Sequence, residues 1–312
     1  MRLRPGVFLV TGFLCVGGVV TAQEPSRTPP AAVGGKKSVV GQSQQPISVT
    51  RIEEKILPPP TENAPQPVGF ESDVYCFGYL GDLSERFPVQ VKGAENLAEQ
   101  TDFITDDYLY ISAGSSRGLK IGDEFWLVTP EQEVLHPTTG RSMGRLYQYR
   151  GRVVVTSLEP RAGIVRVTQA CTDIPMGTYL KPFEPIPIPL VRKSPLAVRG
   201  DPPSGKARGR IVFTRDGVVA LGSDSMVIVD VGTNDGLAPG DFLTVFRYAA
   251  GEEFGVRPIG SYWVNLPPPP GVVVPRTYLG EAVVLTLGER WAIVRLTDSF
   301  RLIQVGDEVE IK

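Results

Sequence analysis

Histidine and cysteine are scarce in this chain, which has one histidine and three cysteines in 312 residues. A histidine-based metal cluster needs several imidazoles, and a Ser-His-acid triad would use the one imidazole that the chain has, that of His136. Because His136 precedes Pro137 between two strand-like segments, it is typical of a turn in a hairpin loop. We therefore expect no enzymatic activity, no metal site and no cofactor.

Charge imbalance and long apolar runs are scarce too. The formal net charge is −2, too small to indicate nucleic acid or an anionic membrane surface as a bulk partner. The most apolar stretch, Val7–Val20, is interrupted by glycines and is short for a transmembrane helix.

The N-terminus has the three parts of a secretory signal peptide. Arg2 and Arg4 precede the apolar stretch, and Val20-Thr21-Ala22 resembles a signal-peptidase site. This predicts a signal peptide over residues 1–22, a periplasmic, secreted or cell-surface location, and no stable membrane span after cleavage. Retention of the segment as a membrane anchor is the alternative.

Removal of the signal peptide takes Cys15 with it and leaves Cys76 and Cys171. An even number of cysteines in an oxidising compartment favours one disulfide bond, with two separately buried thiols as the alternative. Since no CxxC spacing occurs, we expect a structural bond and no redox chemistry.

Two segments are poor in large apolar side chains and divide the chain. Residues 23–66 carry Pro, Ser, Gln and Gly and predict a disordered tether. Residues 182–208 open with spaced prolines and continue with basic residues, which predicts an extended interdomain linker. The linker's alternative role is contact with an anionic envelope polymer or lipid. The remaining ranges, 67–181 and 209–312, are the two expected domains.

Both domains consist of short β-branched runs between glycine, proline and aspartate. Val153-Val154-Val155 and Ile293-Val294-Arg295-Leu296 are examples, and the best helical candidate, Ala94–Glu99, is barely longer than one turn. The pattern predicts an all-β fold of two small barrels or sandwiches.

The two domains also repeat one another in sequence. Residues 111–125 align without a gap on residues 229–243, Met143-Gly144 meets Ile259-Gly260, and residues 151–177 align on residues 280–306. Three matching blocks in the same order predict two copies of one domain. The second copy differs by an insertion at residues 266–276, and only the first copy has the extension that carries Cys76.

The most regular part of the repeat is a glycine pattern that we interpret as a structural turn. Glycines permit positive φ values and close turns, and an aspartate at the end accepts backbone N–H hydrogen bonds. A phosphate-binding loop is a poor alternative, because no helix follows and no Lys-Ser/Thr pair closes the pattern. The predicted turn residues are Gly114, Gly118, Gly122, Asp123, Gly232, Gly236, Gly240 and Asp241.

Aromatic and acidic residues supply the candidate sites. Rings on strands near loop ends bind sugars or peptides in many proteins, although core packing is the alternative for most of them. This candidate binding surface comprises Trp126, Tyr147, Tyr149, Tyr262, Trp263 and Tyr278. Asp106 and Asp107 belong to a cluster of carboxylates, and a pair of carboxylates is the minimum for acid-base work on a glycan.

The first glycine turn, from Tyr110 to Phe125, resembles the β-domain that follows LysM modules in periplasmic LysM-containing proteins. It is also similar to the C-terminal domain of flagellar assembly protein T. His136-Pro137-Thr138-Thr139-Gly140, followed by Met143-Gly144, resembles the next stretch of the LysM-tail proteins, and Val305-Gly306-Asp307-Glu308-Val309 also fits. A LysM module itself is not recognisable in the sequence, so its glycan-binding residues have no counterpart here.

The resemblance implies an accessory role in the cell envelope. Together with export, it predicts a non-catalytic scaffold or binding protein that associates with peptidoglycan and whose partners are an envelope protein complex or a glycan polymer. The alternative function is a polysaccharide-active enzyme or ancillary module that uses Asp106 and Asp107.

Overall fold

The computed structural model describes residues 64–95, 98, 101–191, 196, 202–215, 217–218, 220–248, 256–259, 262–265 and 275–312. The predicted signal peptide, nearly all of the predicted tether, most of the insertion and part of the basic linker lie outside the described residues. By internal contacts, every described residue belongs to one compact unit, Pro58–Lys312.

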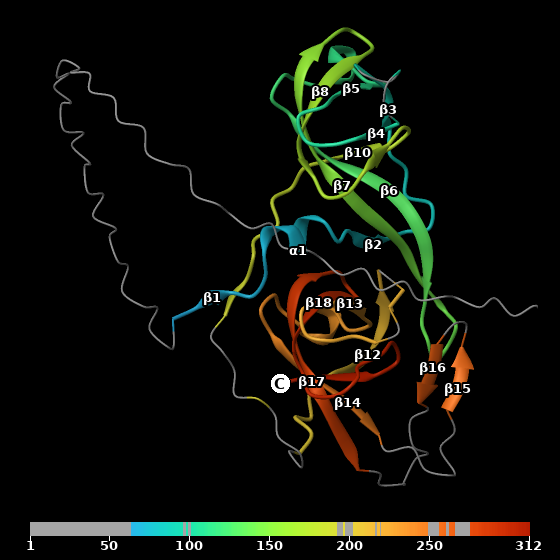
Figure 1. The fold of residues 1–312 in the computed structure, drawn as a ribbon, viewed down its shortest axis with the longest axis vertical. Helices are drawn as coiled ribbons and strands as arrows, with labels where there is room; N and C mark the ends of the chain where they lie inside the picture. The colour runs from blue at the N-terminus through green and yellow to red at the C-terminus, as the bar shows by residue number, and fades with distance from the viewer. Residues whose placement is uncertain are drawn as a thin grey trace, which may run out of the picture. The chain divides into compact units, whose positions relative to one another are not determined.

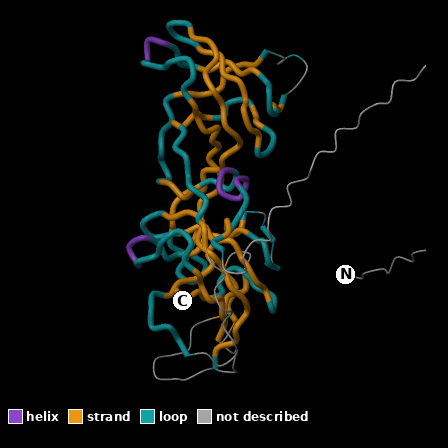
Figure 2. The backbone as a smooth tube through the Cα atoms, turned by 90° about the vertical axis from the view of Figure 1, so that its left-hand side faces the viewer, coloured by secondary structure: helices purple, strands orange, loops and turns teal. Residues whose placement is uncertain are grey.

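Strands dominate the described residues, and helix is confined to α1 (Glu71–Tyr75) and two single 3-10 turns, η1 (Ser115–Arg117) and η2 (Thr233–Asp235) (Figure 2). The predicted all-β class is confirmed. The expected helix at Ala94–Glu99 is wrong where it can be checked, because Ala94 ends a strand and pairs with Leu109.

The first barrel is closed by six antiparallel strands in the order β7-β6-β10-β3-β5-β8, with β8 pairing back to β7 (Figure 1). Alternate side chains along each strand enter the core, among them Val91, Leu109 and Val165, because strand neighbours point to opposite faces. The strands are β3 (Val89–Ala94), β5 (Tyr108–Ile111), β6 (Glu124–Leu135), β7 (Ser142–Leu158), β8 (Gly163–Ala170) and β10 (Tyr179–Pro182).

The second barrel is closed by six strands in the order β12-β13-β18-β17-β14-β19. If the strands of each barrel are counted along the chain, both barrels follow the circuit 1-2-5-4-3-6, so the predicted duplication is confirmed as two similar barrels. The strands are β12 (Arg208–Thr214), β13 (Met226–Val229), β14 (Phe242–Tyr248), β17 (Arg276–Leu287), β18 (Ala292–Ser299) and β19 (Glu308–Ile311).

A bridge outside the main strands is repeated as well. In the first barrel β4 (Asp102–Phe103) pairs with β9 (Ile174–Pro175), and in the second barrel Leu221 pairs with Ile303 at the matching positions. Both bridges bury an apolar side chain from a loop at the edge of the core.

The glycine pattern forms the same turn in both copies. Gly118 and Gly236 both have φ of 83°, in the left-handed region that a side chain disfavours. Asp123 accepts a hydrogen bond from the backbone N–H of Lys120 at 2.8 Å, as predicted for this aspartate. Asp241 accepts the matching bond from Ala238, also at 2.8 Å.

The first glycine of the pattern has a different role from the predicted one. Gly114 and Gly232 have extended backbones, with φ of −143° and −147°. A Cβ at Gly114 would lie 2.0 Å from the carbonyl oxygen of Glu159, so this position is glycine because two backbone segments approach closely.

In the first copy β6 and β7 continue past the barrel as a long hairpin, here called the arm, which reaches the second barrel (Figure 1). Val134 and Leu146 of the arm share one apolar cluster with Phe213, Ile228 and Ile293 of the second barrel. The two barrels are therefore packed together.

Two further segments join the barrels. The extension that precedes β3 contains α1 and β2 (Tyr79–Gly81), which pairs with β7, and its Val74 packs on Val283 and Leu285 of the second barrel. Residues 183–191 form an extended strap, and β11 (Leu190–Val191) in it pairs with β1 (Gln66–Pro67). A separate hairpin of β15 (Val256–Ile259) and β16 (Tyr262–Asn265) follows β14.

Candidate functional site

Three of the predicted binding-surface rings are core residues. Trp126, Tyr147 and Tyr149 are only 2%, 1% and 6% exposed, and the rings of Trp126 and Tyr149 stack with centroids 4.3 Å apart. The prediction that they form a binding surface is therefore wrong, because a ligand has no access to their faces. They lie on the outside of the first barrel, on β6 and β7, but other segments cover them.

The cover of this aromatic layer comes from the extension and the strap. Tyr75 and Phe183 lie against Trp126 with ring centroids 5.2 Å and 4.7 Å away. Tyr79 stacks on Tyr147 at 5.4 Å. Sequence inspection missed this because the covering segments are loop-like and fall outside the repeat.

The phenols of the layer act as neutral structural groups. Burial, followed by a hydrogen bond to Glu85, raises the pKa of Tyr79 well above its usual range, and burial raises the pKa of Tyr149 in the same direction. The Tyr79 hydroxyl donates to Glu85 at 2.8 Å, and the Tyr147 hydroxyl donates to the carbonyl of Asp82 at 2.6 Å.

The other three predicted rings belong to the second copy. Tyr278 is half-buried on β17, and its ring lies 5.4 Å from that of Phe300. Tyr262 and Trp263 lie on β16, but their side chains are outside the described part of the structure.

The predicted acidic pair has structural partners. Asp106 forms an ion pair with Arg166 at 2.9 Å, and Asp107 accepts a hydrogen bond from the N–H of Ile104 at 2.8 Å. The same turn recurs in the second barrel, where Asp224 pairs with Arg295 at 2.6 Å. Asp106 and Asp224 both have positive φ, at 74° and 69°, which aspartate tolerates better than most residues.

This Asp-Arg pair is the repeated charged feature that sequence inspection missed. Arg166 and Arg295 were matched by the repeat, but the aspartates lie five residues upstream of the first aligned block. Extension of the same gapless alignment from Ile111 back to Asp106 would have matched them.

The only histidine, His136, lies at the tip of the arm, where the sequence predicted a turn. Its Nδ1 accepts hydrogen bonds from the backbone N–H groups of Thr138 and Thr139, each at 3.2 Å, so Nε2 carries the proton. That Nε2 donates to Oδ2 of Asp230, 2.9 Å away on the second barrel. The other oxygen of Asp230 accepts from the backbone N–H of Arg210.

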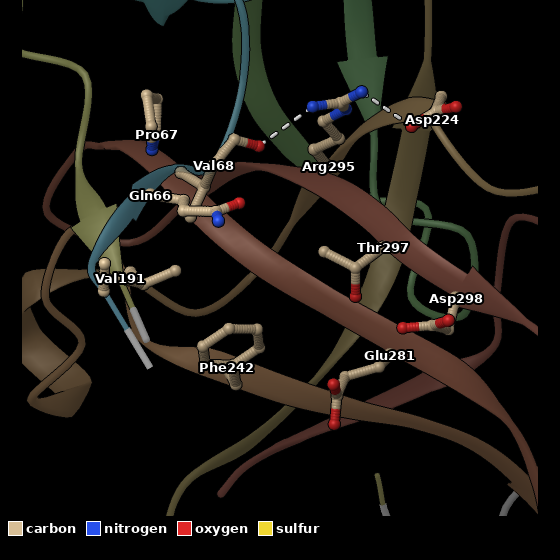
Figure 3. Close-up of a pocket in the computed structure, with 11 residues that line it drawn as sticks. Gln66, Pro67, Val68, Val191, Asp224, Phe242, Glu281, Arg295, Thr297 and Asp298 are labelled. Carbon is tan, nitrogen blue, oxygen red and sulfur yellow. Dashed lines mark hydrogen bonds and ion pairs between the residues drawn. The ribbon is translucent and has the colours of Figure 1, made fainter. Parts of the chain in front are cut away.

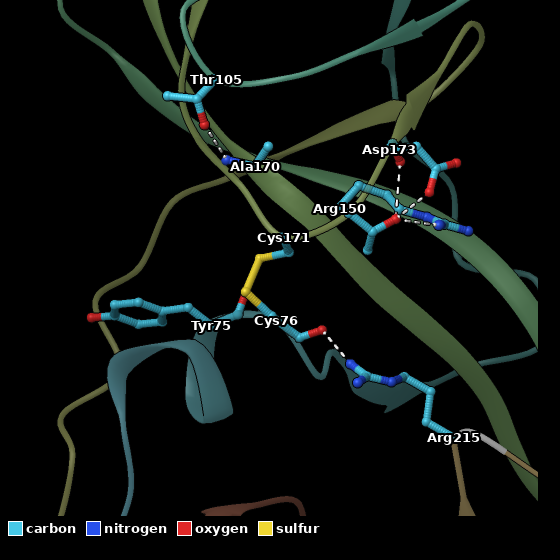
Figure 4. The surroundings of a disulfide bond; sticks show 9 residues. Tyr75, Cys76, Thr105, Arg150, Ala170, Cys171, Asp173 and Arg215 are labelled. Carbon is cyan, nitrogen blue, oxygen red and sulfur yellow. Dashed lines mark hydrogen bonds between the residues drawn. A yellow bond between two sulfur atoms is a disulfide. The ribbon is translucent and has the colours of Figure 1, made fainter. Parts of the chain in front are cut away.

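The predicted disulfide between Cys76 and Cys171 is formed (Figure 4). It ties the end of α1 to the residue that follows β8, as expected for a bond that holds the extension on the first domain. Arg215 of the second barrel donates to the carbonyl oxygen of Cys76 at 3.0 Å, so the bonded segment also contacts the second barrel (Figure 4).

A cavity of about 400 Å³ lies where β1 crosses the second barrel (Figure 3). Arg295 lies at one side and is already engaged, because it donates to the carbonyl of Val68 at 3.0 Å and to Asp224 at 2.6 Å. Glu281, on the floor of the cavity, forms an ion pair with Lys312. Three charged residues that line the cavity, Arg295, Asp224 and Glu281, are thus already paired.

A larger cavity of about 840 Å³ lies beside the arm and is lined by Glu85, His136, Asp230 and Trp291. Within the described ranges, no group of three or more His, Cys, Asp or Glu residues is placed to hold a metal ion. Nor do these ranges contain a helix with the length and apolar character needed to cross a bilayer.

Comparison of the sequence with protein-family models finds no match, and neither does comparison with curated proteins.

Proposed function

We propose that this chain is an exported, non-catalytic scaffold or binding protein of the cell envelope, associated with peptidoglycan and docking protein or glycan partners through its β-domains. The observation that supports this proposal is that the candidate catalytic side chains have structural partners. His136 fastens the arm to Asp230, and Asp106 is paired with Arg166. Such contacts stabilise a rigid body, and the His136 and Asp230 side chains that line the larger cavity are engaged with one another.

The disulfide and the N-terminal sequence support the proposed location. A bond between Cys76 and Cys171 is the kind that persists in an oxidising compartment. The resemblance of the glycine turn and of residues 136–144 to the tail domain of periplasmic LysM proteins is in keeping with the same compartment.

Peptidoglycan association is tested by sedimentation with isolated sacculi at low and moderate salt. The exported chain is expected in the pellet at both salt concentrations, because docking to a polymer through a β surface depends less on salt than charge attraction alone. Full recovery in the supernatant at both concentrations would contradict this part of the proposal. Crosslinking in the native envelope then identifies the attached protein or polymer.

The non-catalytic part of the proposal is tested with glycan turnover. Asp106→Asn and Asp107→Asn are compared with the unaltered chain on isolated glycan. Turnover by the unaltered chain that disappears in these variants, while the fold is retained, would favour the polysaccharide-active alternative.

A further inference from the structure

The arm docks on one particular face of the second barrel. Phe213 on β12, Ile228 on β13 and Ile293 on β18 form a cross-strand row, since Phe213 pairs with Ile228 and Ile228 with Ile293. Val134 and Leu146 of the arm pack against this row and, with Phe77 and Leu80 of the extension, bury it.

The first barrel has the same row of positions, but there it is open. Gly93 on β3 pairs with Tyr110 on β5, and Tyr110 pairs with Ile164 on β8. The Tyr110 ring lies over Gly93, so it occupies the space that the Phe213 side chain fills in the second barrel. Tyr110 and Tyr108 are 40% and 39% exposed, and both lie on the outer face. This patch of Tyr108, Tyr110 and Ile164 is here called the open row.

The second copy also has a counterpart of the arm. β14 and β17 correspond to β6 and β7, and the hairpin of β15 and β16 lies between them in sequence, as the tip of the arm lies between β6 and β7. This second hairpin is rich in apolar residues: Val256, Ile259, Tyr262, Trp263 and Val264.

The docked arm makes a polar contact between His136 and Asp230. The open row and the second hairpin both lack the residues that form this contact. The open row has Ser112 where the covered row has Asp230, and the Ser112 hydroxyl accepts from the N–H of Gln90 at 3.0 Å as Asp230 accepts from Arg210. The second hairpin has no histidine, because the chain's one histidine is His136. The second hairpin, which lacks the histidine, therefore corresponds to the open row, which lacks the aspartate.

We propose that the open row of the first barrel binds the β15–β16 hairpin of a second copy of the chain, in a head-to-tail contact that repeats the arm-on-barrel contact within each molecule. The two surfaces are different, so each molecule keeps one free end after pairing. A contact of this kind propagates into a filament or closes into a ring, of which the smallest is two copies that exchange hairpins. The contact lacks the help of a covering extension, so it is expected to be weaker than the internal one.

Sedimentation velocity of the exported full-length chain over a concentration series tests this proposal. The unaltered chain is expected to form species larger than the monomer as concentration rises, and Tyr110→Glu is expected to weaken the association by about ten-fold or more, because it places a charge at the centre of the contact. Leu302→Glu is the matched control: it adds the same charge at another exposed apolar position and is expected to leave association unchanged. Circular dichroism and an intact disulfide check that each variant is folded.

A mixing experiment tests the head-to-tail geometry. Trp263→Glu in the second hairpin and Tyr110→Glu in the open row are each expected to be monomeric alone. When they are mixed, the intact hairpin of one fits the intact row of the other, so a dimer that grows no further is expected. An unaltered chain that stays monomeric at all concentrations, or a mixture that does not pair, would overturn the proposal. Loss of sacculus binding by Tyr110→Glu in a chain that is always monomeric would assign the row to glycan instead.

Discussion

The two barrels share a strand circuit but stabilise the same outer face by different chemistry. In the first barrel the face of β6, β7 and β10 carries the aromatic layer. In the second barrel the face of β14, β17 and β19 carries arginines and carboxylates. The barrel core is therefore the common element, and the outer face is where the two copies have diverged.

The residues of this outer face differ between the two copies at matching positions. From the first copy to the second, the matching residues are Trp126 and Thr244, Tyr147 and Arg276, Lys181 and Glu310, and Phe183 and Lys312. Glu310 lies between two guanidinium groups, with Arg276 at 2.6 Å and Arg208 at 2.9 Å. Lys181, in contrast, lies over the Tyr79 ring at 3.7 Å.

The aromatic face and the charged face differ in how they are covered. An exposed aromatic layer would be an apolar patch, and here the extension and the strap cover it. In the second copy the charged end of the face is paired within the barrel, where Glu310 is only 2% exposed, and the same segments cover only its apolar end, at Val283 and Leu285. The aromatic layer of the first copy therefore depends on the extension and the strap, and on the disulfide that holds the extension in place.

The largest expected effect comes from breaking the aromatic layer. Trp126→Ala is expected to lower the free energy of unfolding by about 3 to 5 kcal/mol, because the ring is buried on all sides. Thr244→Ala at the matching half-buried position is expected to cost less than about 1 kcal/mol. Urea denaturation of both variants measures the difference, and equal losses would contradict the contrast between the two faces.

Removal of the disulfide tests whether the cover depends on it. Cys76→Ser with Cys171→Ser opens a loop of 95 residues and is expected to lower the free energy of unfolding by about 2 to 4 kcal/mol. Hydrogen exchange is expected to rise first in α1 and β2. The matched control is Phe300→Ala, because Phe300 occupies the position of Cys171 in the second copy and is exposed. Unchanged exchange in α1 would show that packing alone holds the extension.

The ionic face is expected to respond to acid. Burial acts to raise the pKa of Glu310, but hydrogen bonds from Arg276 and Arg208 outweigh it, so the pKa lies below its ordinary value of 4.5. A carboxylate with a lowered pKa stabilises the fold above its unfolded pKa, and this contribution is lost as pH falls through the folded pKa.

Glu310→Gln is therefore expected to cost about 2 kcal/mol near neutral pH, and this cost is expected to shrink only once the pH falls below the ordinary pKa of 4.5. Urea denaturation at several pH values measures this trend. If the loss of unfolding free energy in Glu310→Gln did not change with pH, Glu310 would contribute through its shape and not through its charge.

The smallest effect is expected at the tip of the arm. His136→Ala removes the hydrogen bond to Asp230 and is expected to cost about 1 kcal/mol. Hydrogen exchange is expected to rise in the arm and to stay the same in the core of either barrel. His136→Gln keeps a donor for Asp230 and serves as the control, with a smaller rise expected.

Sequence alone predicted the parts of the structure that depend on local patterns. The strand class followed from β-branched runs, the duplication from matched glycines, and the Cys76–Cys171 bond from the count of cysteines that follow the predicted signal peptide. The turn aspartates, such as Asp123, were assigned correctly because an Asx hydrogen bond involves only neighbouring residues.

The rest depends on contacts between residues far apart in the chain. Trp126 and Tyr149 are on an outer face, and nothing in their own strands shows that Tyr75 and Phe183 cover them. The His136–Asp230 contact joins residues 94 positions apart, one in each copy, so it required knowledge of how the barrels pack. For the same reason the open row was recognisable only by comparison with its covered counterpart.

The disulfide also determines how the molecule would respond to tension. Five of the six strands of the first barrel, all but β10, lie between Cys76 and Cys171. A force applied at the two ends of the chain would pass through the sulfur atoms and bypass those strands. While the bond is intact, the chain between the two cysteines, about 300 Å long when fully extended, cannot be stretched by this force. Reduction releases that length, so the redox state of one bond sets the maximum extension of this protein.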